Sequence, residues 1–77
     1  MEFLDRITVS PEIMRGRPCV RGQRITVGLV VNLVANGMTP SEILREYPSL
    51  EEDDIRQCLR YAADLAEHRE VNLAIPG

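Results

Sequence analysis

The residues best suited to chemistry in this chain are arginines gathered in one short segment. Four of them fall within residues 15–24, together with two glycines: Arg15, Arg17, Arg21 and Arg24. A guanidinium group can bind a carboxylate or a phosphate through two parallel hydrogen bonds, and glycine lets the backbone approach a partner closely. In one interpretation the segment is a loop that contacts an anionic partner. A second interpretation stays open, in which these arginines pair with acids of the same chain or of a second copy.

A second group of candidate binding residues lies further along the chain, at Arg56, Gln57 and Arg60. The two arginines share one face of a helix because they are four residues apart, and we expect Gln57 at the surface beside them. These side chains could meet DNA phosphates, or the arginines could pair with acids of their own helix. The four consecutive acids of residues 51–54 point in different directions on a helix, so they predict dipole stabilisation and not a metal site.

The residues that an enzyme would need are few. His68 is the single histidine and lies in a charged run, and neither Cys19 nor Cys58 has a predicted base beside it. The cysteine spacing does not fit a zinc site, and no glycine-rich phosphate loop is present. Cys58 falls on an apolar helix stripe, so we expect it to be a small buried residue. We expect no catalytic activity, no cofactor, no metal and no small-molecule substrate.

Charge is distributed unevenly along the 77 residues, which carry a formal net charge of −3 and no lysine. Residues 1–30 hold five arginines and three acids, whereas residues 31–77 hold four arginines and nine acids. An acidic protein has no overall field that attracts nucleic acid, so DNA binding would need a local patch in the first half. The acidic start does not resemble a signal peptide, and the apolar stretch 25–35 is too short to cross a bilayer. We expect a cytoplasmic protein without membrane contact.

Three helices are predicted to position these side chains. Residues 27–36 have apolar side chains at helical spacing between a threonine cap and Asn36-Gly37, although their valines also suit a strand. Capping boxes at residues 39–42 and 49–52 predict the start of a short helix and of a long one. The long helix carries an apolar stripe that we expect to be buried, made of Ile55, Cys58, Leu59, Ala62, Leu65 and Ala66.

The segments before and after the helices show strand-like alternation. Residues 1–25 predict a β arm of short strands and turns, which has too few apolar residues to fold alone. Residues 70–77 predict a tail with apolar side chains at every second position, namely Val71, Leu73 and Ile75. The prediction is one mainly α domain over residues 1–77, a three-helix helix-turn-helix core (26–69) of homeodomain-like type with a short N-terminal β arm. Because so short a chain buries only about 60% of its unfolded surface, we also expect a homodimer.

The order of these motifs resembles a known family. The runs "ITVSPEIMRGRPCVRGQRITV" and "ANGMTPSEILREYPSLEEDDIRQCLRYAAD" are similar to the bacterial and archaeal domain-of-unknown-function family 433. The matching positions are Gly16, Pro18, Arg21, Gly22, Arg24, Ile25, Val27, Gly37, Glu42, Ile43, Leu44, Tyr47, Pro48, Leu50 and Asp54. The resemblance implies a homeodomain-like three-helix fold with a β-structured arm. It also implies an antitoxin role in some members, which are encoded beside a PIN-like ribonuclease toxin.

Two functions of different classes follow, and a third stays open. In the first, the chain is an antitoxin whose arginine loop or tail blocks the acidic active site of a neighbouring PIN-like ribonuclease, and which can also repress its own operon. In the second, it is a DNA-binding transcriptional regulator without a toxin partner, with Arg56, Gln57 and Arg60 facing the DNA. The acidic first turn of the long helix counts against the second function. The third is a dimeric scaffold unrelated to nucleases.

Overall fold

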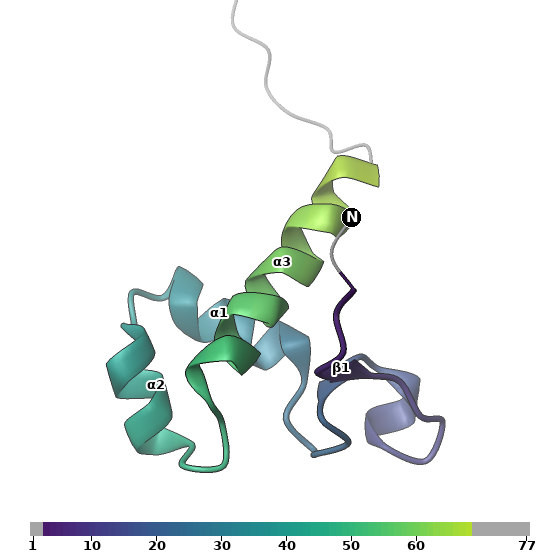
Figure 1. Cartoon of the computed structure of the whole chain (residues 1–77), viewed down its shortest axis with the longest axis horizontal. Helices are drawn as coiled ribbons and strands as arrows, with labels where there is room; N and C mark the ends of the chain where they lie inside the picture. Colours follow the sequence, from purple (N-terminus) through teal and green to yellow (C-terminus); the bar gives the residue numbers. More distant parts are fainter. Residues whose placement is uncertain (1–2, 69–77) are drawn as a thin grey trace, which may run out of the picture.

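The computed structural model describes residues 3–68, and three helices make up most of this part of the chain (Figure 1). The helices are α1 (Val27–Ala35), α2 (Pro40–Glu46) and α3 (Glu52–His68). They follow a small sheet of β1 (Ile7–Thr8) and β2 (Cys19–Val20), with the 3-10 turn η1 (Met14–Gly16) between the two strands. The structure thus confirms a mainly α fold with a three-helix core and an N-terminal β arm.

Side-chain caps set the ends of the first two helices. The Thr26 hydroxyl accepts a hydrogen bond from the Leu29 amide at 3.0 Å, and α1 ends before Gly37, which has a φ of 93°. At α2, the Glu42 amide donates to the Thr39 hydroxyl at 3.2 Å, and the Thr39 amide donates to the Glu42 carboxylate at 2.9 Å. These contacts confirm the predicted helix over α1, and they confirm the capping box of α2.

The start of α3 differs from the prediction. The helix begins at Glu52, and the side-chain contact at its start joins Glu51 to Asp54, because the Glu51 amide donates to the Asp54 carboxylate at 2.7 Å. The capping box predicted at residues 49–52 is wrong. The Leu50 amide closes a turn onto the Tyr47 carbonyl at 2.9 Å, so this segment belongs to the tight turn between α2 and α3.

The arm forms within one chain. β1 pairs antiparallel with β2, with Ile7 opposite Val20. The chain then reverses through a turn in which Arg21 and Gly22 both have positive φ, 46° and 72°, and the Gln23 amide donates to the Val20 carbonyl at 2.8 Å. Val20 is fully buried, so the arm contributes to the same hydrophobic core as the helices.

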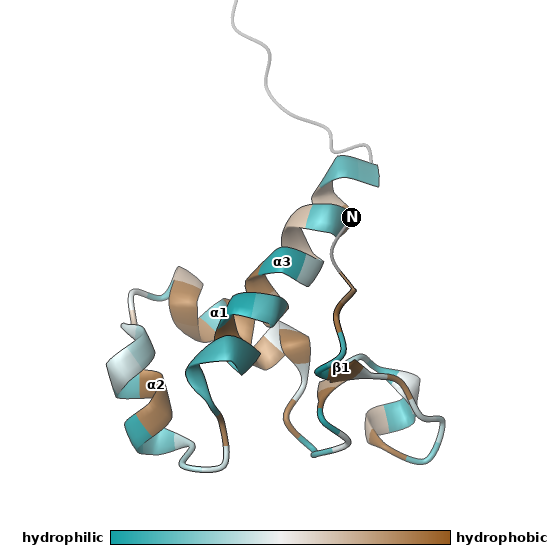
Figure 2. Cartoon of the chain, in the orientation of Figure 1, coloured by the Kyte–Doolittle hydropathy of each residue, from teal (hydrophilic) through white to brown (hydrophobic). Residues whose placement is uncertain are grey.

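The core lies where the arm and the three helices meet. Its buried apolar residues are Val20, Val27, Val30, Ile43, Leu50, Ile55 and Cys58, which confirms the burial predicted for Cys58. Figure 2 shows hydrophilic residues along much of the outer face of α3. None of the helices within residues 3–68 is long and apolar enough to cross a membrane.

The apolar stripe of α3 is buried only near its start. Ile55 and Cys58 are buried, whereas Leu59 and Leu65 are 39% and 40% exposed. The second half of α3 extends past α1 and α2 in Figure 1, and residues 65–68 are exposed. The prediction of a fully buried stripe was wrong for Leu59, Leu65 and Ala66.

Candidate functional site

A buried carboxylate, Asp54, joins the arm to the start of α3. Arg21 approaches it with a guanidinium fork, Nε lying 3.0 Å from Oδ1 and Nη2 lying 2.8 Å from Oδ2. Arg6 donates to Oδ1 through Nη1 at 3.0 Å, and the Glu51 amide donates to Oδ2. Two positive side chains from the arm thus compensate a carboxylate with no exposed surface.

The pKa values in this cluster favour the charged forms. Burial by itself raises the pKa of Asp54, but hydrogen bonds from Arg21, from the Glu51 amide and from Arg6 outweigh burial and hold the pKa below its ordinary value. Hydrogen bonds to Glu51 and Asp54 raise the pKa of Arg6, and the hydrogen bond to Asp54 raises that of Arg21. The contacts are therefore charge-assisted at neutral pH.

Arg21 is committed to this internal contact. Its Nη2 also donates to the Ser49 carbonyl at 2.6 Å, in the turn before α3. Its positive φ is unusual for a residue other than glycine and persists where surrounding contacts hold it. Of the two interpretations left open by the sequence, pairing with acids of the same chain is the one that applies to Arg21.

Gln57 lies under the arm and not at the surface. It is 2% exposed, and its amide accepts from the Arg6 backbone amide at 2.9 Å and donates to Asp5 at 2.8 Å. The expectation of an exposed Gln57 was wrong because the start of the arm covers this face of α3. Arg56 donates to Asp53 at 2.6 Å and Arg60 lies 3.7 Å from Asp64, so both arginines pair within their own helix.

Sequence reasoning missed Arg6 as an anchor of the arm. Arg6 contacts three of the four consecutive acids, Glu51, Asp53 and Asp54. The charge difference between the two halves of the chain did predict pairing of this kind. It could not identify Arg6, because 45 residues separate this side chain from Glu51.

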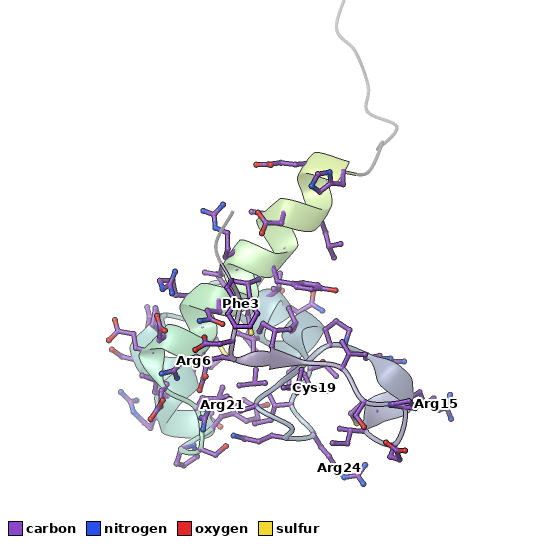
Figure 3. All side chains as sticks on the ribbon, turned by 45° about the vertical axis from the view of Figure 1, so that its right-hand side comes forward. Phe3, Arg6, Arg15, Cys19, Arg21 and Arg24 are labelled. Carbon is purple, nitrogen blue, oxygen red and sulfur yellow. The ribbon has the colours of Figure 1, made fainter. Side chains whose placement is uncertain are left out.

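The other three arginines of the loop line one hollow on the arm. Arg15, Arg17 and Arg24 are exposed, and within residues 3–68 their guanidinium groups form neither an ion pair nor a hydrogen bond. Figure 3 shows Arg15 and Arg24 pointing away from the molecule, whereas Arg6 and Arg21 lie toward the helices. We call this feature the arginine hollow; its volume is about 460 Å³, and its other lining residues are Pro11, Glu12 and Met14.

The backbone of the arginine hollow has an uncommon conformation. Met14, Arg15 and Gly16 all have positive φ, and the turn is closed by the Gly16 amide on Ile13 at 3.1 Å. Glu12 accepts a hydrogen bond from the Ser10 hydroxyl at 2.6 Å, which lowers the pKa of Glu12. The hollow therefore holds three guanidinium groups and one carboxylate, and it is a positive patch on a chain whose net charge is −3.

In the part of the chain from Phe3 to His68, no group of three or more His, Cys, Asp and Glu side chains is placed to hold a metal ion. Burial and the nearby Asp54 raise the pKa of Cys58 to about 12, so its thiol stays protonated at neutral pH. The predicted contacts of Val71, Leu73 and Ile75 lie outside the described residues.

Comparison with known proteins gives related sequences and a related structure. The family described as "Protein of unknown function (DUF433)" matches residues 7–62. "Uncharacterized protein y4eO" of Sinorhizobium fredii (strain NBRC 101917 / NGR234) is 41% identical over 56 residues, which span 73% of this chain and 25% of that protein. The crystal structure of a DUF433 member protein from Anabaena variabilis ATCC 29413 is similar with a TM-score of 0.76 and 26% identity, over 83% of this chain and 63% of the other. The chain thus spans about a quarter of one relative and less than two thirds of the other.

Proposed function

The chain belongs to the DUF433 family, and from this premise we propose that it is a non-enzymatic, antitoxin-like protein of the cytoplasm that binds and neutralises a PIN-like ribonuclease. The observation that carries the proposal is the division of the loop arginines into two groups. Arg21 anchors the arm to Asp54, whereas Arg15, Arg17 and Arg24 remain exposed in one hollow. The anchored arm presents the second group to a partner.

The chemistry of the arginine hollow suits an acidic partner. A ribonuclease that holds a divalent cation with carboxylates carries a cluster of negative charge when the cation is absent. A guanidinium fork matches a carboxylate with two hydrogen bonds and remains charged at any physiological pH. Arginines placed among those carboxylates would neutralise them and occupy the space of the metal ion, so the nuclease would lose activity.

Reading of DNA through α3 is the weaker alternative. The first turn of α3 carries Glu52 and Asp53 at its surface, and DNA phosphates would repel these carboxylates. Gln57 is buried under the arm, and Arg56 already pairs with Asp53. Repression of its own operon by this chain would therefore need a surface other than the one predicted at Arg56, Gln57 and Arg60.

Co-expression with the product of the adjacent gene tests the proposal. The neighbour alone should arrest growth, and the chain should restore growth and co-purify with it. The triple variant Arg15→Gln, Arg17→Gln and Arg24→Gln should bind at least about 100-fold more weakly, because all three charge-assisted contacts are lost. Growth arrest should then return.

The matched control is Arg45→Gln, which removes an exposed arginine of α2 far from the hollow in sequence. This variant should still neutralise the nuclease. Circular dichroism should show the same helix content for both variants, since none of these side chains packs in the core. A harmless neighbour, or full neutralisation by the triple variant, would contradict the proposal.

A further inference from the structure

An apolar groove lies between α1 and the second half of α3, on a surface that shares only Arg17 with the arginine hollow. Its volume is about 480 Å³, and Arg17 and Pro18 of the arm border it. The side chains that form its walls include Leu29, Val31, Asn32, Tyr61, Ala62 and Leu65. We call it the α1/α3 groove.

The apolar surface of this groove is open to solvent. Leu65, which continues the apolar stripe of α3, is 40% exposed, and Tyr61, which packs against the core, is only half-buried. Exposed apolar patches with a polar rim are typical of association sites. The groove therefore extends the core to a surface that a second molecule can cover.

Gly28 leaves room at the groove for close approach. A Cβ at this position would meet only the Thr26 hydroxyl, at 4.0 Å, and Gly28 does not have a positive φ. The fold therefore does not require glycine here, and glycine weakens a helix relative to alanine. With Ala62 also in the lining, the backbone of α1 and a small side chain of α3 are available to a packed helix.

The charge of the groove favours a second copy of this chain as its occupant. The walls contain no acidic side chain, and Arg17 at the border is the single charged residue of the lining. Two chains of net charge −3 repel one another least where the facing surfaces are neutral. Asn32, exposed on the groove, carries both a donor and an acceptor, so two copies related by a two-fold axis can hydrogen-bond reciprocally.

We propose that two copies of the chain pack their α1/α3 grooves together around a two-fold axis near Asn32. Leu65 and Tyr61 of each copy then cover the groove of the other. The arginine hollows stay on the surface of this dimer, apart from Arg17, which borders both features. Formation of the dimer does not require the proposed nuclease partner.

Sedimentation equilibrium of the full chain tests the interface with two leucines of matched exposure. Leu65→Glu places a charge in the groove and should raise the dimer dissociation constant at least about 100-fold. Leu59→Glu makes the same change on α3 at a residue outside the groove, and the constant should stay within about twofold. Gly28→Ala should weaken the dimer about tenfold while helix content is retained, which separates loss of docking from loss of folding.

Cross-linking gives a positive signal for the two-fold axis. Cys19 and Cys58 are buried, so Asn32→Cys should introduce the reactive thiol and form a covalent dimer under mild oxidation. Ser41→Cys on the exposed side of α2 should stay monomeric on a denaturing gel. A wild-type chain that is monomeric up to about 1 mM overturns the proposal. So does equal disruption by Leu59→Glu and Leu65→Glu, or cross-linking of Ser41→Cys without that of Asn32→Cys.

Discussion

At the scale of single residues, Asp54 governs how the arm attaches. Its carboxylate is fully buried and receives hydrogen bonds from Arg6, Arg21 and the Glu51 amide. Removing one member of such a cluster leaves an uncompensated buried charge. The resulting loss of folding free energy is larger than the net stabilisation that the intact cluster provides. The stability of the arm therefore depends on keeping all members together.

Substitution of this carboxylate should be costly. Asp54→Asn is expected to lower the free energy of unfolding by about 3 kcal/mol, at the low end for a broken buried pair because both arginines keep some solvent contact. Asp64→Asn removes a partly exposed intrahelical pair and should cost less than about 1 kcal/mol. Urea denaturation measures both values. Equal losses would show that the Asp54 cluster is not the anchor.

The pKa of the Asp54 carboxylate predicts how the stability of the folded chain changes in acid. Its pKa is lower in the folded chain than in the unfolded chain, so the unfolded chain takes up the proton first as pH falls. The stabilisation is complete above the unfolded pKa of about 4 and is lost as pH falls through the folded pKa. Denaturation curves recorded from pH 7 to pH 2 should show this loss, and Asp54→Asn should make the profile flatter. If the stability of the variant depended on pH in the same way as that of the wild type, Asp54 would not be the cause of the loss in acid.

At the scale of elements, short-range contacts explain where the first two helices begin. The Thr39–Glu42 box satisfies amides that would otherwise lack a partner at the start of α2, which is only seven residues long. Without its cap, a helix this short has little to hold its first turn. The turn between α2 and α3 then follows directly from the end of α2.

Loss of this cap should be measurable. Thr39→Ala should lower the free energy of unfolding by about 1 kcal/mol, because the Glu42 amide loses its acceptor. Ser41→Ala, at an exposed position of the same helix, should change it by less than about 0.5 kcal/mol. Thermal unfolding followed by circular dichroism compares the two. A Thr39→Ala variant as stable as Ser41→Ala would mean that packing alone holds α2.

At the scale of the whole molecule, negative and positive side chains lie on two different surfaces. The acids of residues 51–54 begin α3 and are partly neutralised by Arg6 and Arg21, whereas the arginine hollow keeps its positive charge. The net charge of −3 thus conceals a local positive patch. Such a patch steers an acidic partner even when the overall field does not.

The association rate with the nuclease should therefore depend on salt. Raising the ionic strength from about 0.05 to about 0.5 M should lower the association rate constant about tenfold, because the exposed guanidinium groups become screened. Stopped-flow fluorescence measures the rate. The triple arginine-to-glutamine variant should be slow at both salt concentrations, and a salt-independent wild-type rate would argue against steering by the hollow.

The sequence by itself determined the features that depend on residues close together in the chain. Caps at Thr26 and Thr39 indicated α1 and α2, and Cys58 was correctly placed in the core by helical spacing. These signals are readable because a cap or a stripe joins residues about three or four positions apart. The family resemblance was carried by the same short motifs.

Only the tertiary structure decided which candidate site residues are available to a partner. Arg21 pairs with Asp54 across 33 residues, and Gln57 meets Asp5 across 52, so no local pattern could show that both are internal. The exposure of Leu65 likewise depends on where the short helices end in space. A side chain's neighbours in three dimensions, and not its type, decide whether its charge is already paired within the chain. For this reason the four-arginine segment could be found in the sequence, but its division into one anchor and three exposed groups required the fold.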